Sequence, residues 1–400
     1  MDPALAIIED SALTALAKEI DQSSYNALGL QLRFEKAELQ SLLTEHNNDV
    51  NASTGALLSA WKAKHQGDAP TQAEHLSSAL KEVGLSSLEE KVKAAASEPT
   101  ERCRVLLWSV PRAGSTALAK CLTAIPESEV WYEPYFYSYT ARAEYKANLN
   151  EELPLDYAGH EKAFQKVVDL LEILEEKKLE PERLPYAVVK RQLESTTSKH
   201  VIVKDIGLAV AEGLFDYLPD GFKHTFLIRH PVRYISSYRR AAYKQYCEMS
   251  FLDDTTADEK KYDVERDDRF FTSGAWMKEL YDLWNYVKEN VDSDPVIIDT
   301  DDLLTKPAET LRAYCKAVGL PYSESLLEWS ASTDSLKTWK AAGDSLVTGL
   351  VKAHRAAMKS SEFLPPSKFP DQSQLTPDVI RCTEGVMKYY NEMHEHRLKV

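Results

Sequence analysis

The stretch RVLLWSVPRAGSTALAKCL, residues 104–122, decides the fold of the larger part of this 400-residue chain. Its first part, 104–109, is mostly apolar and favours a short buried strand. Residues 110–116 are typical of a turn, and residues 117–122 return to the apolar spacing of a helix. A strand, a small-residue loop and a helix N-terminus together aim backbone N–H groups at an anion. The stretch therefore predicts a phosphate loop in an α/β domain with a central parallel sheet.

The loop lacks the lysine of nucleotide-hydrolysing P-loops, whose pattern is GxxxxGK[ST]. When the two are aligned on Gly114, the first glycine becomes Ser109 and the lysine becomes Ser115. The cation of this loop is Arg112, two residues before the glycine. Since no lysine is present to bridge β- and γ-phosphates, the loop suits a donor that is not a β,γ-triphosphate. A P-loop kinase acting on a small molecule is an alternative that Ser115 disfavours.

Two segments resemble sulfotransferases that use 3′-phosphoadenosine 5′-phosphosulfate (PAPS). Pro111–Thr116 matches the family's loop of Pro, a basic residue, a small residue, Gly, Ser or Thr, and Thr. The apolar run 224–228 ends in Arg229, and Ser237 follows in the next helical segment. In the family, an arginine and a serine at this spacing grip the 3′-phosphate. Arginine suits such a site because its planar fork binds phosphate with two hydrogen bonds.

This resemblance covers most of residues 103–330 and implies a PAPS-dependent sulfotransferase of the EC 2.8.2 type, with a three-layer P-loop fold. It implies PAPS as the donor substrate, a hydroxyl or amine of a small molecule as the acceptor, and no metal. The residues that it assigns to donor binding are those of the loop and of the second segment: Arg112, Ala113, Gly114, Ser115, Thr116, Ala117, Arg229 and Ser237.

An alcohol acceptor also needs a general base. Cytosolic members of the family use a histidine two residues after a lysine, but here Lys204 is followed at that position by Ile206. Another branch uses a glutamate in a Glu-Pro context, which Glu133 matches. Aromatic neighbours would raise the pKa of this carboxyl by desolvation, as a base requires. We predict Glu133 as the base with Asp205 as the alternative, and expect Lys204 and Arg112 to stabilise the leaving phosphate.

The aromatic run WYEPYFYSY, residues 131–139, predicts either the lining of an apolar acceptor pocket or a buried structural cluster. Farther along, Trp339 and Lys340 are candidates for closing the donor site. Many cytosolic members carry a tryptophan directly after the loop, where this chain has Ala117. Because Ile206 replaces the usual histidine, a second function stays open, namely an inactive, nucleotide-binding signalling adaptor.

Residues 1–94 contain repeated helical periodicity and no strand-like alternation. Two sets of residues follow the i, i+3, i+4, i+7 pattern: Leu13, Leu16, Ala17 and Ile20, then Leu76, Ala79, Leu80 and Val83. The pairs Thr71 with Glu74 and Ser86 with Glu89 have capping-box spacing, and Gly84 is placed to end a helix. Such short helices must bury their apolar stripes against one another, which predicts a small six-helix bundle.

The same segment resembles a death domain in the runs 25–34 (YNALGLQLRF) and 80–85 (LKEVGL), and in the leucines before Trp61. This resemblance implies assembly with other death-domain proteins or with a second copy. The charged, proline-containing stretch that follows is the best boundary. We therefore expect a helical bundle over 1–94, a linker over 95–103 and the P-loop domain over 104–400.

The bulk composition narrows the classes of partner and compartment. A net charge of −15 argues against nucleic acids and anionic membranes, which select basic faces. The five cysteines are scattered without a CxxC pair, which argues against a disulfide framework or a zinc site. No stretch of eighteen apolar residues and no secretion signal is apparent. Together these features predict a cytoplasmic protein.

Overall fold

A computed structural model describes residues 10–64, 69–97, 102–175, 179–211, 213–248, 258–331, 338–342 and 360–400. The chain divides into two compact units, Met1–Glu101 and Arg102–Val400. Helix α6 continues to Ser97 and strand β1 begins at Cys103, so the predicted linker 95–103 is too long at both ends. The sequence could not indicate this, because lysine, alanine and serine at the end of α6 suit a helix as well as a linker.

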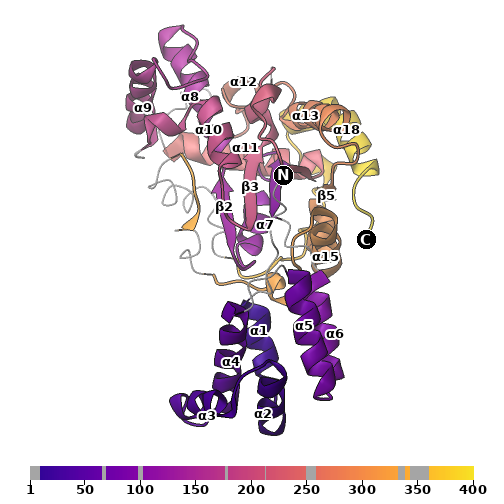
Figure 1. The fold of residues 1–400 in the computed structure, drawn as a ribbon. Helices are drawn as coiled ribbons and strands as arrows, with labels where there is room; N and C mark the ends of the chain where they lie inside the picture. The colour runs from indigo at the N-terminus through magenta and orange to yellow at the C-terminus, as the bar shows by residue number, and fades with distance from the viewer. Residues whose placement is uncertain are drawn as a thin grey trace. The chain divides into compact units, whose positions relative to one another are not determined.

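The N-terminal unit is helical throughout its described residues, as predicted (Figure 1). The buried core contains the leucines of the predicted stripes together with Tyr25 and Trp61, each fully buried. The Trp61 indole N–H donates to His75 Nδ1 at 3.3 Å, which satisfies its polar atom inside the bundle. The helices are α1 (Asp10–Ala17), α2 (Gln22–Gln31), α3 (Lys36–Glu45), α4 (Val50–Lys64), α5 (Ala69–Glu82) and α6 (Ser86–Ser97).

Helix ends in this bundle follow the predicted rules only in part. Gly84 has a φ of 82°, and Leu85 N–H donates to the Leu80 carbonyl across it, so the glycine ends α5 as expected. The predicted capping box at Thr71 is wrong, because α5 already begins at Ala69. A capping box does occur at Glu35, with glutamate in place of the usual serine or threonine.

The second unit is built on a five-stranded sheet whose strands are all parallel. The strand order is β2-β3-β1-β4-β5, so β1 lies at the centre and its carboxyl end meets those of β3 and β4 (Figure 1). The predicted α/β fold with a parallel sheet is thereby confirmed. The strands are β1 (Cys103–Ser109), β2 (Ser128–Tyr132), β3 (His200–Ile206), β4 (Lys223–Ile228) and β5 (Ile297–Asp299).

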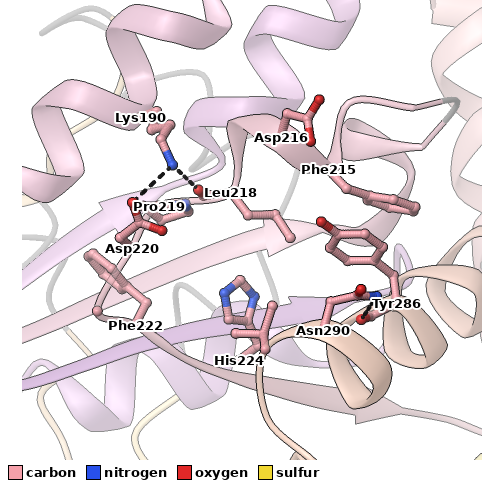
Figure 2. A pocket seen from close by; sticks show the side chains of 12 residues that line it. Lys190, Phe215, Asp216, Leu218, Pro219, Asp220, Phe222, His224, Tyr286 and Asn290 are labelled. Atoms are coloured by element: carbon pink, nitrogen blue, oxygen red, sulfur yellow. Dashed lines mark hydrogen bonds and ion pairs between the residues drawn. The ribbon is translucent and has the colours of Figure 1, made fainter.

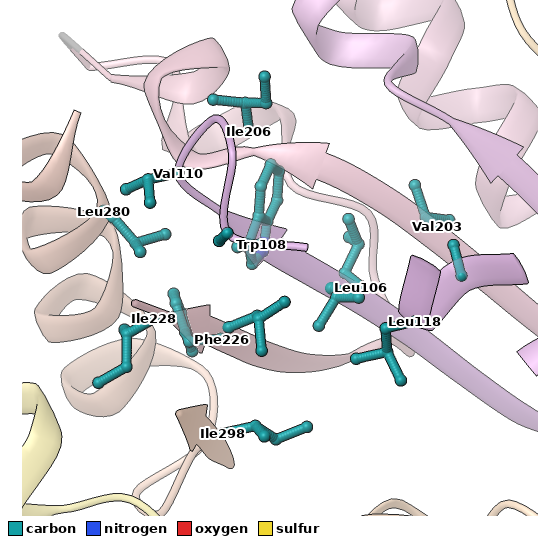
Figure 3. Packing of buried hydrophobic residues seen from close by; sticks show 14 of the residues in the cluster. Leu106, Trp108, Val110, Leu118, Val203, Ile206, Phe226, Ile228, Leu280 and Ile298 are labelled. Carbon is teal, nitrogen blue, oxygen red and sulfur yellow. The ribbon is translucent and has the colours of Figure 1, made fainter. Parts of the chain in front are cut away.

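Helices cover both faces of this sheet. Trp108 of β1 lies against Tyr135 of α8 on one face, with ring centroids 6.0 Å apart. On the other face the hydroxyls of Thr225 and Tyr314, the latter on α15, are 3.1 Å apart. Leu106, Trp108 and Phe226 lie side by side across β1 and β4 (Figure 3). Because successive side chains of a strand point to opposite faces of the sheet, each strand contributes to the core on both sides.

Among the helices of the second unit, α8 contacts α9 and α10, and α18 packs on α11 and α13. The helices are α7 (Ser115–Leu122), α8 (Pro134–Leu149), α9 (Glu161–Glu175), α10 (Tyr186–Glu194), α11 (Pro231–Glu248), α12 (Val264–Asp267), α13 (Met277–Asn290), α14 (Thr300–Thr305), α15 (Pro307–Val318) and α18 (Pro377–Glu395). None of the described helices is long and apolar enough to cross a membrane.

The aromatic run 131–139 is divided between two elements. Residues 131 and 132 end edge strand β2, and Pro134 begins α8, which carries the remaining aromatic residues. The run contains no alternation that would reveal the strand. Outside β2, Lys340 forms a parallel bridge with Trp131 and extends the sheet edge by one more short segment.

Candidate functional site

The predicted phosphate loop lies between β1 and α7, at the carboxyl end of the central strand. Gly114 caps α7 with a φ of 88°, in the left-handed region where glycine is unstrained. A Cβ added to Gly114 would lie 3.7 Å from Thr300 Cγ2. Arg112 also has a positive φ, 65°, although it is not a glycine. Such a conformation costs free energy and persists only where surrounding contacts hold it.

Those contacts come from the second predicted segment. Arg229 Nη1 donates to the Arg112 carbonyl oxygen at 2.7 Å. In turn, Arg112 Nε donates to Ser237 Oγ at 3.2 Å, from the second turn of α11. The structure thus brings Arg112 to Arg229 and Ser237, which lie more than a hundred residues later in the chain.

The electrostatics of this cluster favour an anion. Burial lowers the pKa of the Arg112 guanidinium, and the positive charge of Arg240 lowers it further. For Arg229 burial again contributes most to a lowered pKa; the negative charge of Asp301 opposes this shift, and Arg233 and Arg112 add to it. Arg229 Nε is buried and has no hydrogen-bond partner among the described residues. Crowded, partly desolvated guanidinium groups with a spare donor suit a phosphate or phosphosulfate, because an anion relieves their mutual repulsion.

The remaining loop residues are positioned by short contacts. Ser109 Oγ donates to Ser115 Oγ at 2.9 Å, so the two residues at the positions of the P-loop glycine and lysine bond to each other. Thr116 is buried near the Tyr132 phenol. Ala113 is fully buried, whereas Ala117 is partly buried on α7.

Thr300 joins the loop to the neighbouring strand and was missed by sequence reasoning. Its hydroxyl lies 2.7 Å from the Ala113 carbonyl oxygen and 2.8 Å from that of Ile228, and can donate to either. Thr300 begins α14 directly after β5, and it is buried. A polar residue after a strand of a parallel sheet was the available signal, since carboxyl ends of parallel strands share one edge.

Glu133 and Lys204 form a buried ion pair beside this loop. Glu133 precedes α8 with a φ of 51°, a second non-glycine residue in the left-handed region, and its N–H donates to the Lys204 carbonyl at 2.7 Å. The Glu133 carboxylate pairs with Lys204 Nζ. That ammonium also lies 4.8 Å from the centroid of the Tyr132 ring. Tyr132, a second residue missed by sequence reasoning, is fully buried, which raises the pKa of its phenol well above the usual range.

The Asp205 carboxylate, unlike that of Glu133, binds backbone N–H groups. Its carboxylate accepts hydrogen bonds from the N–H groups of Tyr135 (2.7 Å), Phe136 (3.1 Å) and Ile206 (2.8 Å), which satisfies the first turn of α8. It has no exposed surface. Burial, followed by the negative charge of Glu133, raises the pKa of Asp205 to about 8. The side chain therefore caps a helix and does not face a space that a substrate could enter.

The residues proposed to close the donor site lie at the edge of the sheet. Trp339 is buried and stacks on Tyr132 with ring centroids 5.7 Å apart. Its indole N–H donates to Thr123 Oγ1 at 3.0 Å. Lys340 Nζ pairs with Glu129 at 2.9 Å. The Trp339 ring thus packs against the Tyr132 ring, and the Lys340 ammonium pairs with Glu129 and not with a loop residue. The neighbouring residues 335–337 lie outside the described part of the chain.

Comparison with known proteins identifies the N-terminal unit. Residues 10–96 match the family model of the death domain. The death-domain resemblance expected from the sequence is therefore confirmed for this bundle. Among the residues that the structure describes, no group of histidine, cysteine and carboxylate side chains could hold a metal ion.

The rest of the chain has more distant relatives. The branched-chain-amino-acid aminotransferase-like protein 1 of Arabidopsis thaliana is 22% identical over 224 residues, which are 56% of this chain and 31% of that protein. The chain thus spans about a third of the length of this curated relative. The sulfotransferase domain from the curacin biosynthetic pathway is 14% identical, with 72% of this chain and 98% of that chain covered and a TM-score of 0.36. The sulfotransferase domain from the Synechococcus PCC 7002 olefin synthase is 15% identical, with 72% of this chain and 96% of that chain covered and a TM-score of 0.33.

Proposed function

We propose that residues 102–400 form a sulfotransferase that transfers the sulfuryl group of PAPS to a hydroxyl or amine of a small-molecule acceptor. The observation that carries the proposal is the convergence of Arg112, Arg229 and Ser237 on one phosphate loop, with a buried, unpaired Nε on Arg229. Two guanidinium groups and a hydroxyl supply several donors to one phosphate. The Walker lysine position holds Ser115, which supports a donor other than a nucleoside triphosphate.

Glu133 is the best candidate for the general base. It keeps 9% of its side-chain surface exposed, whereas Asp205 has none. In the proposed reaction the acceptor oxygen attacks sulfur, the bond from sulfur to the 5′-phosphate oxygen breaks, and the acceptor proton moves to a Glu133 carboxylate oxygen. Lys204 holds this carboxylate in place, and Arg112 would stabilise negative charge on the departing phosphate. The strained backbone at Glu133 and Arg112 is in keeping with a preorganised site.

Calorimetric titration with 3′-phosphoadenosine 5′-phosphate, the desulfated donor, tests the proposal. The wild-type chain is expected to bind it, and Arg229→Ala to bind at least about tenfold more weakly, because a charge-assisted hydrogen bond is lost. Lys223→Ala is the matched control, since it removes one positive charge at the other end of the same strand. A wild-type protein that does not bind the nucleotide refutes the proposal. Binding without turnover on a panel of alcohols and amines would favour the inactive adaptor.

We also propose that the death-domain bundle mediates assembly, either with other death-domain proteins or with a second copy of the chain. Leu30 on α2 is a candidate contact residue for such assembly, because this apolar side chain has 46% of its surface exposed. Sedimentation velocity of the full chain over a concentration series tests self-association, with Leu30→Glu expected to weaken it. Equal sedimentation of the variant and the wild type would exclude this surface.

A further inference from the structure

A cavity of about 320 Å³ lies at the amino end of the sheet, opposite the phosphate loop (Figure 2). His224, the second residue of β4, lies at its centre, whereas Arg229 follows the other end of that strand. Its walls come from α10, the turn before β4, and the end of α13: Lys190, Phe215, Asp216, Leu218, Phe222, Tyr286 and Asn290. A volume of this size accommodates a small organic molecule.

The hydrogen bonding of His224 decides which atom it presents. His224 is 1% exposed, and the Trp108 indole N–H donates to its Nδ1 at 3.0 Å. An indole nitrogen can only donate, so Nδ1 must be the unprotonated nitrogen. Burial lowers the pKa of His224 to about 4, so the ring is neutral near pH 7 and carries its proton on Nε2. No described residue accepts a hydrogen bond from this Nε2–H.

The walls combine aromatic faces with several polar side chains, among them Asp216, Asp220 and Asn290. The rings of Phe215 and Tyr286 stack with centroids 4.3 Å apart, and Leu218 and Phe222 add apolar surface. Figure 2 shows the His224 ring between this aromatic pair and the side of the cavity formed by Lys190. An apolar ligand body is therefore expected against Phe215 and Tyr286, with a polar atom toward His224.

The charged side chains around the cavity disfavour an anionic ligand. The Lys190 ammonium donates to the Leu218 carbonyl (2.5 Å) and forms ion pairs with Glu194 (3.1 Å) and Asp220 (3.6 Å). The ammonium is thus already engaged within the protein. Asp216 adds a further negative charge to the lining. A neutral imidazole N–H beside an excess of carboxylates favours an uncharged acceptor over a carboxylate or phosphate.

We propose that this cavity binds a small, uncharged molecule with an apolar body and one carbonyl or hydroxyl oxygen, which accepts the hydrogen bond of His224 Nε2. The site is separate from the donor site and does not depend on the proposed transferase activity. His224 is a binding residue here and takes no part in the reaction at the loop.

A pair of probes with the same shape tests the chemistry. Benzamide carries an uncharged carbonyl acceptor, and benzoate carries a negative charge at the same place. In ligand-observed NMR titrations of the full chain, benzamide is expected to bind with a dissociation constant on the order of millimolar, as suits so small a ligand. Benzoate is expected to bind at least about fivefold more weakly. Equal binding of the two probes, or no binding of benzamide, would overturn the proposal.

Variants locate the binding. Asn290→Trp, at the exposed end of α13, should obstruct the mouth and abolish benzamide binding, whereas Glu289→Trp is the matched control one residue earlier and outside the lining. His224→Phe keeps an aromatic ring but removes the Nε2 donor together with the acceptor of the Trp108 indole N–H, so it should weaken binding about fivefold. Benzamide bound equally well by Asn290→Trp and the wild type would refute this location, because the contact would then lie elsewhere, for example at an acceptor pocket near the loop.

Discussion

Asp205 and His224 are buried titratable residues of one sheet, on the two strands that flank β1, and their hydrogen bonding differs. Asp205, at the carboxyl end of β3, accepts three backbone N–H groups and has no exposed surface. His224, near the amino end of β4, accepts one hydrogen bond and directs its other nitrogen toward a cavity. Burial and a shifted pKa are common to both. The difference teaches that the atoms left without a partner, and not burial itself, distinguish a structural group from a candidate site.

The largest effect is expected at Glu133, which lies at the carboxyl end of the sheet. Glu133→Gln is expected to lower kcat by about 10² to 10⁴, because the base is removed while the shape is kept. Affinity for 3′-phosphoadenosine 5′-phosphate should stay unchanged, since Glu133 is separate from the arginine cluster. Steady-state kinetics and calorimetry on the same preparation measure both quantities. An unchanged kcat would remove Glu133 from the reaction and return Asp205 to consideration.

Substitution of Asp205 is expected to change the stability of the fold and not the rate of the reaction. Asp205→Ala is expected to lower the free energy of unfolding by about 3 kcal/mol, because two backbone N–H groups at the start of α8 and that of Ile206 lose their acceptor. Asp205→Asn, which keeps one acceptor oxygen, should cost less. Urea denaturation of the three proteins measures this. If Asp205→Asn folds with wild-type stability but loses turnover completely, the assignment of Asp205 as a helix cap alone is wrong.

Thr300 should have a smaller effect, transmitted through the loop. Thr300→Val leaves a buried carbonyl of Ala113 or Ile228 without its donor, at a cost of about 1 kcal/mol. Because Ala113 belongs to the phosphate loop, nucleotide affinity is expected to fall about fivefold. Thr300→Ser keeps the hydroxyl and should restore it. Equal calorimetric affinity of the valine and serine variants would show that Thr300 does not position the loop.

The pH dependence of stability offers a further test, because burial shifts the pKa values of the two residues in opposite directions. Asp205 has its pKa raised by burial to about 8, so its contribution to stability is complete below its unfolded pKa and is lost as pH rises toward 8. His224 has its pKa lowered by burial to about 4, so its contribution is present above its unfolded pKa near 6.5 and is lost as pH falls toward 4.

Between about pH 6.5 and 8 Asp205 alone acts, and stability should decline with rising pH. The difference in unfolding free energy between the wild type and Asp205→Asn, measured by urea denaturation at several pH values, isolates this slope. A difference that stays constant across the interval would contradict the raised pKa.

Much of the fold was predictable because it follows from local patterns. Helical spacing in the first ninety residues and the apolar runs around residues 104, 201, 224 and 297 are each readable within a short window. Strand β2 was missed because its five residues run into the aromatic start of α8 without alternation. The N-cap at Thr71 was wrong because the spacing of two residues cannot specify where a helix begins.

Several residues of the candidate site could be named from the sequence, but their arrangement in space could not be predicted. Arg112, Arg229 and Ser237 could be named from the two matching segments, whereas Thr300 and Tyr132 were not named. Tyr132 ends β2 and Thr300 directly follows β5, so both lie at the carboxyl end of the sheet although β2 and β5 are its outer strands. Such meetings depend on strand order, which a short window of sequence does not contain.

A small-residue loop without a Walker lysine after a buried strand, and a helical bundle before it, can both be predicted from the order of residues. Both features arise from neighbouring residues, through backbone conformation and apolar spacing. In contrast, the cap that Asp205 forms, the pairing of Glu133 with Lys204 and the N–H that His224 presents to a cavity become apparent in the folded chain. These roles depend on which distant groups fill the remaining hydrogen-bonding positions, and only the packed fold brings such groups together.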